Sequence, residues 1–120
     1  MLSLLAEATE IVRLTLGLRR ARRSRSPREL VESVRVRGRK RASQSAADRT
    51  RIQRIIRLVD LMIPGRNCYR RALVEIAMDQ SAAGEPLHLG LSAQGGRNSG
   101  HAWIGTKNDA RRHYDAEFTI

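Results

Sequence analysis

The hydrophobic period of this chain changes at Gly84, and that change constrains the fold more than any other feature. Before Gly84, apolar residues recur every three or four positions, which is typical of amphipathic helices. From Leu87 to Ala93 they alternate with polar residues or glycine, which is typical of a half-buried strand. Because helices come first and strands follow, the sequence predicts an α+β fold. Its 120 residues suffice for one compact domain.

The first two expected helices cover residues 1–18 and residues 27–36. Ser26 precedes the second one as an N-cap, with proline at its first position and glutamate three residues after the cap. A basic break is expected at residues 38–41. The apolar series are Leu2, Leu5, Thr9, Val12 and Leu16 in the first helix, and Leu30, Val31 and Val34 in the second.

Two further helices are expected, one between the capping signal at Ser45 and the Pro64-Gly65 stop, the other over residues 67–80. Gly84 is a suitable end signal for the last of them. Their apolar series are Ile52, Ile55, Ile56, Val59 and Met62 in one, and Ala72, Leu73, Ile76 and Ala77 in the other.

Three antiparallel strands are expected after Gly84, over residues 87–93, 101–106 and 111–120, in a meander with a turn at 107–109. Alternation along the third strand separates an apolar face from a polar one. The apolar face has Tyr114, Ala116, Phe118 and Ile120, and the polar face has His113, Asp115 and Glu117.

Cys68 is the only cysteine and follows Asn67, a good N-cap, so it is expected in the first turn of a helix. The unpaired amides and the dipole of a helix start favour a thiolate and could hold an oxyanion. The alternative is a buried structural cysteine, the usual role of a lone cysteine. A single cysteine excludes internal disulfides and fits a reducing compartment, the cytoplasm.

His101 follows Cys68 by 33 residues and shares a strand face with Trp103, while Asp115 comes 14 residues later. A short turn would place His101 opposite a position next to Asp115. Cysteine, histidine and aspartate arranged in this way can act as nucleophile, base and orienter of the base. His88 and a third histidine, His113, are alternative bases.

The net charge of +11 is concentrated in residues 13–41, which carry twelve basic residues against two acidic ones. This block could dock an acidic partner, or be an ordinary solvated face. The candidate docking residues are Arg19, Arg20, Arg22 and Arg23. The block has no aromatic residue, which disfavours nucleic-acid binding. The spacing of cysteine and histidine indicates no metal site, and no apolar run is long enough to span a membrane.

Four segments together resemble the transglutaminase-like cysteine protease family of lasso-peptide biosynthesis, in particular its small stand-alone leader peptidase. They are Cys68-Tyr69-Arg70-Arg71-Ala72-Leu73, Leu89-Gly90-Leu91, Gly100-His101-Ala102-Trp103-Ile104 and Asp115. The resemblance covers roughly residues 60–120. It implies a papain/transglutaminase-like core at residues 45–120, with a nucleophile helix packed on a small antiparallel sheet. Residues 1–44 are then a basic helical N-terminal region.

No cofactor is expected. The resemblance carries the nucleophile over to Cys68, the base to His101 and the orienter to Asp115, and Asn67 and Trp103 are candidate supporting residues beside them. The substrate would be a ribosomally made precursor peptide, cleaved between leader and core. Expected partners are a separate leader-recognition protein and a macrolactam cyclase. A transglutaminase-type acyl transferase with the same triad is the first alternative, and a basic nucleic-acid-binding protein ranks last.

Overall fold

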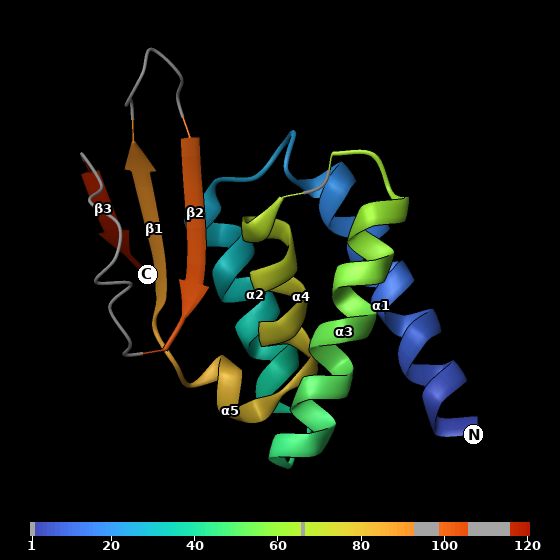
Figure 1. Cartoon of the computed structure of the whole chain (residues 1–120). Coiled ribbons are helices and arrows are strands. Elements are labelled where there is room, and N and C mark those ends of the chain that lie inside the picture. Colours follow the sequence, from blue (N-terminus) through green and yellow to red (C-terminus); the bar gives the residue numbers. More distant parts are fainter. Residues whose placement is uncertain (1, 66, 93–98, 106–115) are drawn as a thin grey trace.

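The computed structural model describes residues 2–65, 67–92, 99–105 and 116–120, with only the backbone at 2, 3, 92 and 99. A group of helices lies beside a small sheet (Figure 1), which confirms the α+β class. None of the described helices combines the length and apolar character needed to cross a membrane. The elements are α1 (Leu2–Ala21), α2 (Pro27–Arg39), α3 (Ala46–Met62), α4 (Cys68–Met78), α5 (Gln80–Ala83), β1 (Leu87–Ser92), β2 (Ser99–Ile104) and β3 (Ala116–Thr119).

Helices α2 and α3 begin at the predicted caps. The Ser26 hydroxyl accepts a hydrogen bond from the Glu29 amide at 3.3 Å, and the Ser45 hydroxyl accepts one from the Asp48 amide at 3.2 Å. Each bond satisfies an amide that has no partner inside its helix. These starts are local features, so the sequence was enough to predict them.

Helix α1 buries a different face from the apolar series expected for it. Leu5 is 68% exposed and Leu16 is also exposed, whereas Ile11, Leu14 and Leu18 are buried. The helix has apolar residues on two faces, and the face of Ile11 packs against α3 and α4. Which face becomes buried depends on these distant helices, so the spacing alone was misleading.

Gly38 lies inside α2 and not in the expected break, because the helix continues to Arg39. A Cβ atom at Gly38 would come within 1.9 Å of the Ile76 carbonyl oxygen in α4. Only glycine therefore permits the close approach of α2 and α4. The expected helix over 67–80 also divides, because Asp79 ends α4 and caps α5.

The sheet has the order β2-β1-β3, so β3 pairs with β1 and not with β2 as the meander required. In the register, Leu89 of β1 lies opposite both Ala102 of β2 and Phe118 of β3. Helix α4 packs against β2, and the β2 backbone at Gly100 and Ala102 is directed at the sulfur of Cys68 at the helix start and not at another described strand. Only the free edge of β1 can therefore receive β3. The predicted strand start and turn, residues 106–115, and residue 93 lie outside the described residues.

Candidate active site

Cys68 is the first residue of α4, as predicted. The Asn67 side chain caps the helix by accepting a hydrogen bond from the Arg70 amide at 2.7 Å. This cap leaves the amides of the first turn, those of Cys68 and Tyr69, without an acceptor inside the helix. A thiolate or an oxyanion at this position would gain from these amides and from the helix dipole.

The sulfur of Cys68 lies against the backbone of β2. The Ala102 amide donates a hydrogen bond to Sγ at 3.2 Å, and Sγ lies 3.8 Å from the Gly100 carbonyl oxygen. The two contacts lie on either side of His101 in the sequence. The nucleophile candidate and the strand of the base candidate, separated by 33 residues, therefore meet, and the thiol is only half-buried.

The rings of His101 and Trp103 stack on one another, with centroids 5.6 Å apart and planes 22° apart. Ala102, between them, is buried in the core, so the two aromatic side chains lie on the other face of the strand. The prediction that His101 and Trp103 share a face is confirmed. Trp103 thus acts as a platform that limits the orientations of the His101 ring.

His88, a rival base in the sequence, has a different part in the structure. Its ring stacks on Trp103 from the opposing strand, with centroids 5.3 Å apart. Nε2 lies 2.7 Å from the Gly105 carbonyl oxygen, so this nitrogen carries the hydrogen, and Nδ1 lies 3.0 Å from the Thr119 hydroxyl. Because both ring nitrogens have a hydrogen-bond partner, the His88 ring is held in place, and by stacking it supports the Trp103 ring. Alternation placed His88 on the polar face, but finding its partner required the strand register.

Asp115 and His113 lie outside the described residues, so the third member of the expected triad is not placed. The argument that put Asp115 opposite His101 was wrong, because β1 lies between β2 and β3. The role of Asp115 therefore stays a prediction.

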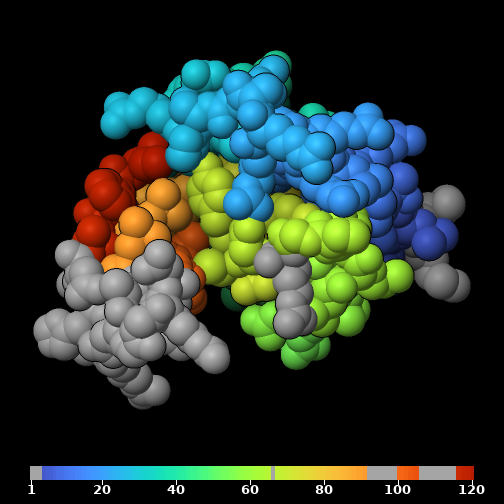
Figure 2. Space-filling view, turned by 90° about the horizontal axis from the view of Figure 1, so that it is seen from above, coloured from blue at the N-terminus to red at the C-terminus, as the bar shows by residue number. Residues whose placement is uncertain are grey.

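Two cavities meet at Cys68, and both Cys68 and His101 contribute to the lining of each. The larger, about 960 Å³, lies between the starts of α2 and α4 and the strands; Figure 2 looks onto this side. Leu89, Leu91 and Phe118 make it largely apolar. The smaller, about 390 Å³, lies between β2 and helices α3 and α4, and five long polar side chains contribute to its mixed lining. These are Arg49, Gln53, Arg57, Arg71 and Glu75.

Tyr69 and Arg22 form one wall of the larger cavity. The Arg22 guanidinium lies over the Tyr69 ring, 5.7 Å from its centre, and the phenol donates a hydrogen bond to the Pro27 carbonyl at 3.4 Å. Burial raises the pKa of the Tyr69 phenol, and the Arg22 charge opposes this shift. Arg22, expected in a docking face, thus borders the cavity that contains Cys68, while Arg19 and Arg23 are exposed.

A buried ion pair, absent from the sequence-based expectations, holds the loop that leads to Cys68. Arg70 and Asp60 are each 1% exposed, and Arg70 Nε donates to Asp60 Oδ1 at 2.5 Å. Arg70 also donates to the carbonyls of Ile63 and Pro64 at 2.9 and 2.8 Å. One side chain thus ties the end of α3 and the loop after it to the first turn of α4. In the sequence, the only sign of this role was a charged residue three positions after an N-cap, where a charged side chain is normally expected to be exposed to solvent.

In the described ranges, no three histidine, cysteine or acidic side chains gather as they would around a metal ion.

A cysteine at a capped helix start, packed on a strand with a histidine, is the arrangement expected of cysteine-dependent acyl-transfer proteins. The Transglutaminase-like superfamily matches residues 12–116, which include Cys68, His101 and much of the basic N-terminal region. The chain therefore belongs to this superfamily, which includes cysteine proteases and acyl transferases. No curated protein and no solved structure matches the chain.

Proposed function

We propose that this chain is a cysteine peptidase that removes the leader from a ribosomally made lasso precursor peptide. The observation that carries the proposal is the position of Cys68. Its sulfur lies at a capped helix start, against the backbone of the strand that bears His101, at the junction of two cavities. Membership of the superfamily and the resemblance of the motifs around Cys68 and His101 support the same conclusion.

In the proposed reaction, His101 accepts the Cys68 proton and the sulfur attacks the scissile carbonyl carbon. The first-turn amides of α4 stabilise the oxyanion. The C–N bond then breaks, and the imidazolium gives its proton to the leaving amine. Water, deprotonated by His101, attacks the thioester, releasing the carboxylate and restoring the thiol. Asp115 is the proposed orienter of His101.

The shape of the site suits an extended peptide. A chain crossing Cys68 would place side chains on one side in the apolar cavity of about 960 Å³ and on the other in the polar cavity of about 390 Å³. Leu91 and Phe118, which line the larger cavity, are 50% and 54% exposed. They offer an apolar surface to an incoming residue. A separate leader-recognition protein and a macrolactam cyclase are the partners that we propose on the resemblance.

The test uses a short precursor peptide and a small recognition protein, both to be sought among the genes that neighbour this one. Mass spectrometry of the products, with and without an added primary amine, separates hydrolysis from amine transfer. We expect a free leader carboxylate in both cases, and no cleavage by Cys68→Ala or His101→Ala proteins with unchanged circular dichroism. A leader–amine product would instead identify an acyl transferase, since both activities share the acyl-enzyme.

A further inference from the structure

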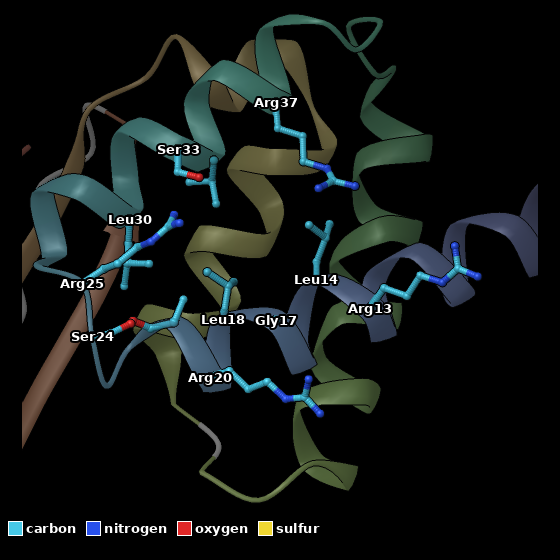
Figure 3. A pocket seen from close by; sticks show the side chains of 12 residues that line it. Arg13, Leu14, Gly17, Leu18, Arg20, Ser24, Arg25, Leu30, Ser33 and Arg37 are labelled. Atoms are coloured by element: carbon cyan, nitrogen blue, oxygen red, sulfur yellow. The ribbon is translucent and has the colours of Figure 1, made fainter.

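A groove of about 480 Å³ runs between α1 and α2, separate from both cavities at Cys68 (Figure 3). Its floor is apolar, because Leu14 and Leu18 of α1 face Leu30 of α2, and Val34 of α2 also contributes to the lining. Gly17 adds space to this floor, since a Cβ atom built there would meet nothing within 4 Å. The groove is thus a built hollow with room for side chains from another molecule.

Arginines surround the apolar floor. They are Arg13, Arg20, Arg25 and Arg37, and all four are exposed. Among the described residues, no carboxylate forms an ion pair with Arg13, Arg20 or Arg25, and Arg37 reaches Glu10 only at 3.9 Å. The charges at the rim are therefore largely available to an acidic partner.

We propose that this groove docks an acidic, amphipathic peptide segment of a partner protein. Apolar side chains of the segment would fill the floor and its carboxylates would meet the arginines. A nucleic acid fits less well, because none of the described lining residues is an aromatic platform for a base and the floor offers only aliphatic contacts.

The groove leads toward the cavity that contains Cys68. Ser24 and Arg25 line the groove, whereas their neighbours in the chain, Arg22 and Ser26, line the cavity of about 960 Å³. A peptide segment that extends out of this end of the groove would therefore reach the cavity of about 960 Å³ that contains Cys68. The role of this link in delivering a peptide to Cys68 rests on the proposed function, but the docking itself does not.

The structure also revises which arginines matter. Of the four docking candidates in the sequence, only Arg20 lines the groove, and Arg22 lines the larger cavity at Cys68. Arg19 and Arg23 are exposed and contribute to neither lining. They provide a matched control, because replacing them changes the net charge by the same amount.

The experiment measures binding of a fluorescein-labelled heptad-repeat peptide of leucine and glutamate by anisotropy at two ionic strengths. We expect R13Q/R20Q to weaken binding about fivefold at low salt, with a smaller effect at high salt, and R19Q/R23Q to leave it nearly unchanged. Gly17→Leu should fill the groove and weaken binding at least as much, without changing charge, while Gly17→Ala should not.

Four outcomes would overturn the inference: no binding of the peptide, equal losses in the two arginine pairs, equal binding of a polyglutamate peptide, or tighter binding of a single-stranded oligonucleotide. The alkylation rate of Cys68 by iodoacetamide is measured in the same variants and should not change. If the acidic peptide binds the groove as expected but the protein has no peptidase activity, only the proposed function is refuted. Lost docking with peptidase activity retained would refute the groove alone.

Discussion

Replacing Asp60 by alanine should destabilise the protein strongly, because Asp60 is the partner of a buried charge. Its carboxylate accepts from Arg70 Nε at 2.5 Å and from Arg71 Nη1 at 3.1 Å. Arg70 is 1% exposed and cannot turn to water when the carboxylate is removed. The variant would therefore leave a buried guanidinium without its counter-ion.

The magnitude follows from what remains around Arg70. Removing one partner of a buried ion pair costs about 3–5 kcal/mol. Arg70 keeps its bonds to the carbonyls of Ile63 and Pro64, so the lower end of this range applies. About 3 kcal/mol would lower the melting temperature of a chain of this length by about 12 °C.

Urea unfolding followed by far-ultraviolet circular dichroism measures the change in the free energy of unfolding. The matched control is Glu32→Ala, which removes an exposed carboxylate 3.8 Å from Arg39 and should cost less than about 1 kcal/mol. If Asp60→Ala cost no more than Glu32→Ala, the buried pair would not hold the loop before Cys68. If Asp60→Ala also raised the alkylation rate of Cys68, this would show that the loop before Cys68 has loosened.

Three further predictions test the packing around the site. His88→Ala should cost about 1 kcal/mol through lost stacking and should shift the fluorescence of Trp103, the only tryptophan; an unchanged spectrum would contradict the stack. Gly38→Ala should cost about 1–3 kcal/mol by forcing α2 from α4, whereas Gly17→Ala should not destabilise; equal melting temperatures would refute the close contact. Because burial raises the pKa of Tyr69 above 10.0, its contribution to stability is complete below pH 10.0 and declines as pH rises through the raised value. Tyr69→Phe should lessen this alkaline loss in urea titrations, and identical pH profiles would contradict it.

The features that the sequence predicted well are local ones. Ser26, Ser45 and Asn67 each cap the helix that follows, because the acceptor and the amide it satisfies lie three residues apart. The alternation around Ala102 likewise put His101 and Trp103 on one strand face. These calculations need only the chain's own geometry over a few residues.

The features that the sequence predicted wrongly depend on distant partners. The pairing of β3 with β1 accompanies the packing of α4 on β2, where the β2 backbone contacts Cys68, and no strand pattern contains this contact. Helix α1 has two apolar faces, and its packing against α3 and α4 determines which of them is buried. The Asp60–Arg70 pair was not predicted at all, because burial of an ion pair is visible only once both helices are in place.

The central claim, that Cys68 forms an acyl-enzyme with the precursor peptide, is tested most directly by intact-protein mass spectrometry. The protein, its recognition partner and the precursor are mixed and quenched in acid within the first turnover, and the modified residue is located by fragmentation. The account predicts a thioester of the leader on Cys68, which Cys68→Ala does not form and Asp115→Asn forms slowly. Cleavage of the precursor by Cys68→Ala, or an adduct on any other residue, would contradict it.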